Sequence, residues 1–186
     1  MLRVSLTETA LQIKTLDLGP VEHVLSRAPD PPAPEAVRDA VNILTDAGAL
    51  DAAGALTPLG RHLARLPVDV RAGKIIVLGA VLGCVRPALT IAAYLSSKSP
   101  FIAPHDERDA ADRVRVALAA PGAAGIAAGQ RSDHLVVVAA FDGWHAACVA
   151  GGTRGGADYC RRHCLCPVTL AALQGALPGP PRLGSH

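Results

Sequence analysis

Aromatic side chains are scarce in this sequence, with two Phe, two Tyr and one Trp making up 3% of the residues. A core without many large rings has to be built from Leu, Val, Ile and Ala. Charged residues are also few, at 18%, whereas hydrophobic residues reach 50%. This composition predicts a folded chain, because disordered segments combine low hydrophobicity with high charge. The net charge of +2 is too small to indicate nucleic-acid binding by itself.

Long hydrophobic runs are also missing. The longest, residues 75–85, is shorter than the ~20 residues that a membrane span needs, and Lys74 and Arg86 close it on both sides. The first residues carry Arg3 and Glu8 and lack the continuous apolar stretch of a signal peptide. An odd number of cysteines, five, without a signal peptide predicts reduced thiols. We therefore expect no membrane partner and an intracellular location, nuclear or cytoplasmic.

Motifs for nucleotide hydrolysis are missing as well. No G-x-x-x-x-G-K-[ST] string is present, and the glycine-rich residues 151–156 follow a predicted helix, which indicates a flexible loop. The D-E-x-D letters at residues 106–109 are explained by acidic groups at a helix start. Ser132, Asp133 and His134 are adjacent, so they cannot converge as a catalytic triad, and a helix cap by Ser132 or Asp133 explains them better. The sequence predicts no catalytic residue and no cofactor site.

Four of the cysteines lie in the last third of the chain. They are Cys148, Cys160, Cys164 and Cys166. The spacing is C-x3-C from Cys160 to Cys164 and C-x-C from Cys164 to Cys166. Structural zinc sites usually bring two ligand pairs at spacings such as C-x2-C, and a second pair is absent here. Ordinary thiols and no metal are therefore expected, and a zinc module stays an alternative that metal analysis of the purified protein would settle.

Apolar residues at helical spacing predict a mainly α fold, beginning with helices at residues 2–18 and 21–25. A third helix is predicted to begin at Pro34 and to stop at Gly48. After it, Asp51 and Gly54 fit the first and fourth positions of a tight turn, which predicts a small β-hairpin before Thr57 caps the next turn. Three helices followed by a hairpin form the winged-helix pattern.

The remainder is predicted to be a helical bundle. Its helices are expected at residues 71–84, 87–95, 106–118 and 132–149, with short ones around Tyr159 and Leu170. The first of these is apolar on nearly all sides and is predicted to be surrounded by others. In the long helix at 132–149, one apolar stripe is expected to face the core: Val137, Phe141, Trp144 and Cys148. Residues 121–129 are predicted to form a loop, and residues from 178 on a frayed tail.

Short strings distributed along the chain resemble the helicase-associated region of DEAH/RHA-type ATP-dependent RNA helicases. In the first part they are LQIK (11–14), DPP (30–32), ALD (49–51), LTPLG (56–60) and LPVD (66–69). In the second part they are LGA (78–80), LGC (82–84), SKSPF (97–101), SDHL (132–135) and YCRR (159–162). Each string is weak alone, and their order and spacing together are specific. The chain departs from the family at residues 163–166, where HCLC replaces an expected string containing Phe.

The resemblance implies a winged-helix domain at residues 1–66, a ratchet-type helical bundle at 67–177 and a flexible tail at 178–186. In the family, these domains pack against two RecA-like motor domains and enclose a channel for single-stranded RNA. ATP and Mg belong to that motor, whose motifs are missing here. By position, the resemblance gives seven candidate RNA contacts: Ser97, Lys98, Ser99, Asp133, His134, Arg161 and Arg162. Hydroxyls and cations at helix ends can hold phosphates without reading sequence.

We therefore expect an accessory, RNA-guiding region of an ATP-dependent RNA helicase, present here as a fragment without its motor. Whether this chain belongs to an enzyme depends on that parent, since the chain itself carries no ATPase motif. The alternative is an adapter without a motor that binds a protein partner or cofactor through the winged helix. Binding of single-stranded RNA that weakens with salt would separate the two.

Overall fold

The computed structural model describes residues 5–102, 108–118 and 132–176. It is mainly helical, as the sequence predicted. The chain forms two compact units, residues 1–81 (unit 1) and 82–186 (unit 2). The predicted domain boundary between residues 66 and 67 stays a prediction. The predicted loop at 121–129, the tail at 178–186 and the acidic pair at 106–107 lie outside the described residues.

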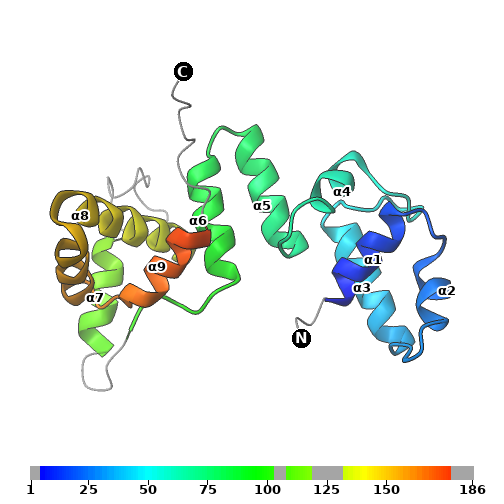
Figure 1. Ribbon diagram of the computed structural model, residues 1–186, viewed down its shortest axis with the longest axis horizontal. Coiled ribbons are helices and arrows are strands. Elements are labelled where there is room, and N and C mark those ends of the chain that lie inside the picture. The colour runs from blue at the N-terminus through cyan, green and yellow to red at the C-terminus, as the bar shows by residue number, and fades with distance from the viewer. Residues whose placement is uncertain (1–4, 103–107, 119–131, 177–186) are drawn as a thin grey trace. The chain divides into compact units, whose positions relative to one another are not determined.

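Unit 1 contains five helices among its described residues, shown from blue to green in Figure 1. They are α1 (Leu6–Thr15), α2 (Val21–Ser26), α3 (Pro34–Asp46), α4 (Pro58–Leu63) and α5 (Val70–Val81). α1 and α2 pack on α3 and on each other, and α4 packs on α5. Their shared core is aliphatic, with Leu11, Leu44 and Leu50 almost completely buried.

The ends of the first helices follow from local sequence. Ser5 and Glu8 form a capping box at the start of α1, in which each side chain accepts a hydrogen bond from the other's backbone N–H. α3 begins at Pro34, and Gly48 follows it with a φ of +78°, so both predicted signals are confirmed. At the end of α1, Asp17 takes the left-handed position that glycine usually fills, with a φ of +54°.

The segment at residues 49–56, called the wing segment below, is less regular than predicted. The Asp51 carbonyl accepts from the Gly54 N–H at 2.9 Å, and the Asp51 carboxylate accepts from the N–H groups of Ala53 and Ala55. The turn is therefore present. A regular β-hairpin is not shown: the described residues of the wing segment form an isolated antiparallel bridge between Leu50 and Leu56. The hairpin stays a prediction.

Helix α5 differs from its prediction. The sequence predicted a helix at residues 71–84 that is buried on nearly all sides, but α5 ends at Val81. Its Val70 and Gly73 face the core of unit 1, whereas Leu78 is 44% and Val81 76% exposed. Unit 1 alone therefore covers only part of the surface of α5, and the predicted burial on nearly all sides is not shown.

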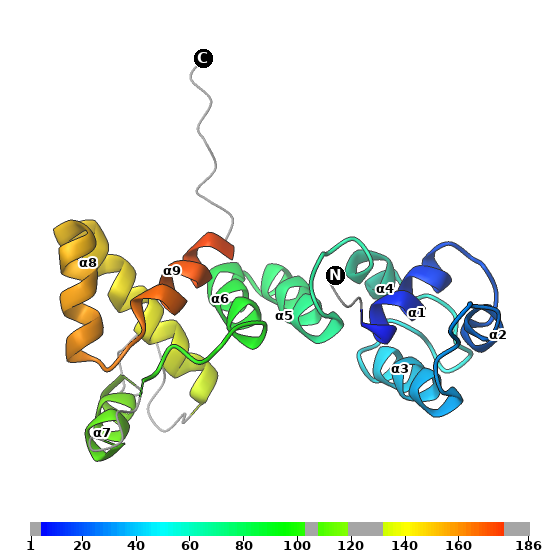
Figure 2. The same ribbon diagram turned by 60° about the horizontal axis from the view of Figure 1, so that its bottom comes forward.

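Unit 2 contains α6 (Val85–Leu95), α7 (Arg108–Leu118), α8 (Asp133–Arg162) and α9 (Pro167–Ala176) among its described residues. α6 and α9 pack on α8 and on each other, and α7 packs on α8, as the two views in Figures 1 and 2 show. The predicted stripe on α8 is confirmed, since Val137, Phe141 and Trp144 are buried and Cys148 packs against the same core.

Helix α8 reverses direction at two glycines. Gly151 and Gly152 have non-helical backbone angles, with φ of −132° and +61°. Residues 153–162 are helical, so only Gly151 and Gly152 of the predicted loop at 151–156 are non-helical. The first arm (133–150) and the second arm (153–162) then pack at very short range through Gly155, which faces the Ala147 carbonyl, and Gly156, which faces Cys148 and Trp144.

By length and composition alone, α8 is the one helix among the described residues that is apolar enough to cross a membrane. Its first arm instead supplies the centre of the unit 2 core, where Ala140 and Phe141 are almost inaccessible. The chain then reverses at Gly151 and Gly152. Both features are those of a core helix.

Candidate nucleic-acid interface

The seven predicted contact residues lie on three segments of unit 2, and backbone pairing joins two of these segments. Phe101, just after the segment at 97–99, forms an antiparallel bridge with Leu165, just after Arg161 and Arg162. The Ile102 N–H donates to the Cys164 carbonyl at 2.8 Å, and the Cys166 N–H donates to the Pro100 carbonyl at 2.7 Å. Residues more than 60 positions apart are thereby held side by side.

The third segment, the start of α8, reaches the same region through an aromatic contact. The rings of Tyr94 and His134 meet edge to face, with centroids 6.2 Å apart and an interplanar angle of 89°. The Ser97 N–H donates to the Tyr94 carbonyl at 3.0 Å. His134 therefore contacts the side chain of Tyr94, and Ser97 is bonded to the backbone of the same residue.

Arg115 on α7 links these segments, and sequence analysis missed it. Its Nη2 lies 3.2 Å from Asp133 Oδ1, and its guanidinium carbon lies 5.2 Å from the centre of the Phe101 ring. We call Arg115, Asp133 and Phe101 the Arg115 cluster. Only the fold brings these residues together, because they come from three separate segments.

Several predicted contacts already have structural roles. The Ser97 hydroxyl donates to the Ala93 carbonyl at 2.8 Å, and the Ser99 hydroxyl accepts from the Phe101 N–H at 3.3 Å. Asp133 pairs with Arg115, and this exposed ion pair offsets part of its repulsion of a phosphate. Ser132 occupies the N-cap position of α8, but its side chain makes no capping hydrogen bond. The Asp133 side chain pairs with Arg115 instead of capping the helix.

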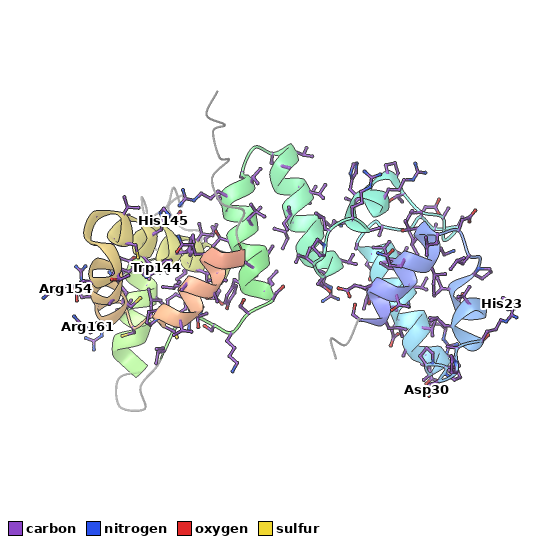
Figure 3. All side chains as sticks on the ribbon, in the orientation of Figure 1. His23, Asp30, Trp144, His145, Arg154 and Arg161 are labelled. Carbon is purple, nitrogen blue, oxygen red and sulfur yellow. The ribbon has the colours of Figure 1, made fainter. Side chains whose placement is uncertain are left out.

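The cations differ in how free they are. Arg161 pairs with Asp158, and the Nε of Arg162 donates to the Asp158 carbonyl at 3.4 Å. Lys98 is exposed and makes no hydrogen bond or ion pair with the described part of the chain. Arg154, which sequence analysis did not select, is exposed on the same arm as Arg161, one heptad earlier, and Figure 3 shows both side chains directed away from the ribbon. Lys98, Arg154 and Arg162 are thus available to phosphates.

Two rings pack against each other at the C-terminal end of α8. Tyr159 and His163 have centroids 4.1 Å apart. Burial lowers the pKa of His163, and the neighbouring positive charge of Arg162 lowers it further. Burial also raises the pKa of Tyr159. His163 is therefore a neutral ring partner near neutral pH.

This pKa shift predicts an acid-sensitive fold. Because the folded-state pKa of His163 lies below the ordinary value of 6.5, the unfolded chain takes up the proton first as pH falls, so this contribution to stability declines below about pH 6.5. Thermal melting between pH 5 and 8 should show a midpoint that falls on the acid side. His163→Phe keeps a ring against Tyr159 and should flatten that decline; an unchanged decline would exclude His163 as its cause.

The cysteines are all free thiols. Burial raises the pKa of Cys160, followed by the effects of Cys148 and Cys166, so the thiol form is favoured there. Hydrogen bonds from Thr169 lower the pKa of Cys166. Within residues 5–102, 108–118 and 132–176, no three His, Cys, Asp or Glu side chains are grouped to hold a metal ion. The zinc alternative therefore gains no support from the described residues.

Comparison with known proteins gives two adjoining family matches. Residues 40–68 match the winged-helix helicase associated domain (HA2), and residues 69–137 match the ratchet-like helicase associated domain (HA2). The chain contains the winged-helix and ratchet-like HA2 domains. The resemblance inferred from short strings is thereby confirmed.

Full-length relatives agree with this assignment. The chain is 41% identical to the ATP-dependent RNA helicase DHX29 of Mus musculus over 175 residues, which cover 94% of the chain and 12% of the relative. It is 46% identical to the ATP-dependent DNA/RNA helicase DHX36 of Bos taurus, covering 93% of the chain and 16% of the relative. It is 40% identical to the DExH-box ATP-dependent RNA helicase DExH3 of Arabidopsis thaliana, covering 93% and 14%. The chain thus spans a small part of each relative.

Proposed function

We propose that this HA2 region guides single-stranded RNA through a DEAH/RHA-type helicase, with the surface around the Arg115 cluster as the contact. The observation that carries the proposal is the convergence of four separate segments: Tyr94 meets His134, Arg115 meets Asp133, and Phe101 pairs with Leu165. Exposed cations beside half-buried rings are suited to hold a sugar-phosphate chain without reading its sequence.

The proposal assigns the chemistry of ATP to RecA-like motor domains of a longer protein. ATP and Mg would bind there, and no catalytic residue is proposed in this chain. The domain limits at residues 1–66 and 67–177 belong to the same proposal, as does a winged helix in unit 1. An intracellular site of action, nuclear or cytoplasmic, is proposed because the relatives are RNA helicases.

RNA titration tests this role. The chain should bind a fluorescent oligo(U) with an affinity that falls as salt rises, and Lys98→Ala and Arg162→Ala should each weaken binding about 3- to 10-fold and reduce the salt slope by about 0.7. Arg38→Ala is the matched control, because Arg38 is an exposed cation of unit 1 that pairs with Glu35. It should leave the affinity unchanged.

The competing role is an adapter that binds a protein partner through unit 1. One observation favours it: Leu16 and Leu18, between α1 and α2, are 65% and 56% exposed. A folded chain that fails to bind RNA, and that forms a stable complex with a protein partner when Leu16 and Leu18 are intact, would support the adapter and contradict RNA guidance.

A further inference from the structure

Arg115 on α7 lies between an aromatic ring and a carboxylate. Its guanidinium carbon is 5.2 Å from the centre of the Phe101 ring, and its Nη2 is 3.2 Å from Asp133 Oδ1. The guanidinium lies over the ring, which shields it from one side, and the ion pair ties it to the start of α8. Two separate segments of unit 2 therefore fix the position of this group.

The Arg115 side chain is nevertheless open to a ligand, because 41% of it is exposed. Asp133 offsets part of its positive charge, whereas Lys98 makes no ion pair with the described part of the chain. Lys98 is thus better suited to attract a phosphate. A guanidinium also offers a flat surface on which a nucleic-acid base can stack, and stacking depends less on net charge.

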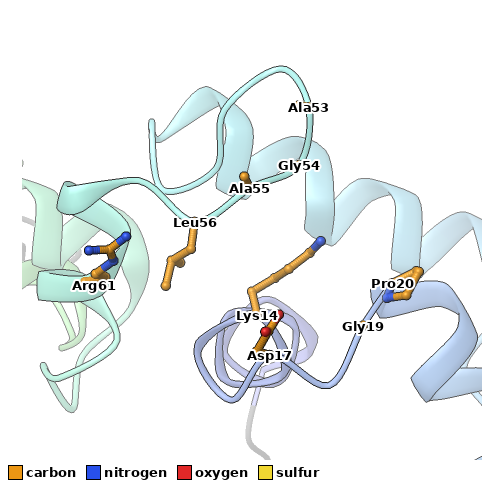
Figure 4. A pocket seen from close by; sticks show the side chains of 9 residues that line it. All are labelled: Lys14, Asp17, Gly19, Pro20, Ala53, Gly54, Ala55, Leu56 and Arg61. Carbon is orange, nitrogen blue, oxygen red and sulfur yellow. The ribbon is translucent and has the colours of Figure 1, made fainter.

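Two other exposed arginines lack this combination. Arg86 forms an ion pair with Asp142 at the same 3.2 Å, but no aromatic ring lies beneath it in the part of the chain that the structure describes. Arg61 lines a hollow of unit 1 together with Leu56, and none of the described residues that line this hollow is aromatic (Figure 4). The ring and the ion pair therefore distinguish Arg115 from an ordinary surface cation.

From this arrangement we infer that Arg115 holds single-stranded nucleic acid by stacking against a base, with Phe101 beneath the guanidinium and Asp133 fixing its position. The inference rests on the proposed RNA-guiding role and specifies which part of the ligand the Arg115 cluster contacts. The faces of a base are open to a side chain where the base is unstacked, so the ligand is a single strand. Every base has such a face, so the contact does not depend on the sequence.

Binding of two fluorescent oligomers to the full chain tests this contact. One is oligo(U), and the other is an abasic ribose-phosphate oligomer of the same length, which offers the same phosphates without bases. The natural chain should bind the abasic oligomer about 10-fold more weakly than oligo(U). Arg115→Lys keeps the charge and removes the planar group, so it should weaken oligo(U) binding about 5- to 10-fold and leave the abasic affinity unchanged. Arg86→Lys, the matched control, should change neither affinity.

Phe101→Leu is a second variant, which leaves every charge in place. It removes the ring beneath Arg115 and should weaken oligo(U) binding about 3- to 10-fold without changing the abasic affinity. Lys98→Ala should instead weaken binding of both oligomers by the same factor, because a phosphate contact is common to both. If Arg115→Lys lowers the melting temperature, Phe101→Leu decides by the same comparison.

The outcomes separate the base contact from the RNA-guiding role. Equal affinities of the natural chain for the two oligomers, or equal losses for both from Arg115→Lys, would overturn the base contact and leave the RNA-guiding role in place. Unchanged oligo(U) binding by Arg115→Lys, at an unchanged melting temperature, would do the same. A natural chain that binds neither oligomer would contradict the RNA-guiding role and the base contact together.

Discussion

Gly155→Ala should lower the free energy of unfolding of unit 2 by about 3 kcal/mol. A Cβ at this position would lie 2.4 Å from the Ala147 carbonyl oxygen on the other arm of α8. A backbone oxygen cannot rotate away as a side chain can, so the two arms must separate. Separation would loosen the contacts of Trp144 and Cys148 with Gly156. Urea unfolding followed by fluorescence measures this directly, because Trp144 is the single tryptophan of the chain and is buried.

Gly151→Ala is the matched control. Gly151 has a φ of −132°, which alanine also adopts, and no atom lies within 4 Å of its added Cβ. This variant should unfold within about 0.5 kcal/mol of the natural chain. Equal losses from the two substitutions would mean that the arms of α8 do not pack through Gly155.

Gly60→Ala should destabilise unit 1 by a similar amount, about 3 kcal/mol. Its Cβ would lie 2.2 Å from the Ala49 carbonyl oxygen and 2.8 Å from a methyl carbon of Leu56. The Thr57 hydroxyl holds the same place together, accepting from the Gly60 N–H at 3.0 Å and donating to the Gly48 carbonyl at 2.6 Å. The substitution therefore forces α4 away from the wing segment. Faster amide exchange at Thr57, whose N–H donates to Ala49, would report it.

Gly73→Ala provides the comparison for unit 1. A Cβ at Gly73 would approach Leu63 Cδ2 at 3.0 Å, and that is a movable side chain. The loss in free energy of unfolding from Gly73→Ala should stay below about 1 kcal/mol. If Gly73→Ala accelerated exchange as much as Gly60→Ala does, the tight contact of α4 with Ala49 would not be what stabilises the wing segment.

Features that depend on neighbouring residues were predicted well. Pro34 and Gly48 delimit α3, and Thr57 with Pro58 begins α4, because a fixed φ, a missing side chain or a capping hydroxyl acts within one turn. The stripe of α8 was also predictable, since four apolar residues at helical spacing must face the same side.

Features that depend on contacts between residues distant in sequence were not predicted. The glycine-rich residues of α8 were predicted to form a loop. The sequence does not reveal that the helix resumes after Gly152 and that Gly155 then packs against Ala147. The exposure of Val81 depends on which neighbours α5 receives. Arg115 carried no sequence signal, since its partners Asp133 and Phe101 are separated from it along the chain and meet it only after folding.

We expect the surface around the Arg115 cluster to contact RNA directly. Photo-crosslinking of the chain to an oligo(U) that contains 4-thiouridine, with the sites mapped by mass spectrometry, tests it most directly. Crosslinks are expected at Tyr94, Phe101 or His134, and their yield should fall at high salt and after Lys98→Ala. A chain that binds the oligonucleotide but crosslinks only outside residues 94–101, 115 and 133–134 would contradict it.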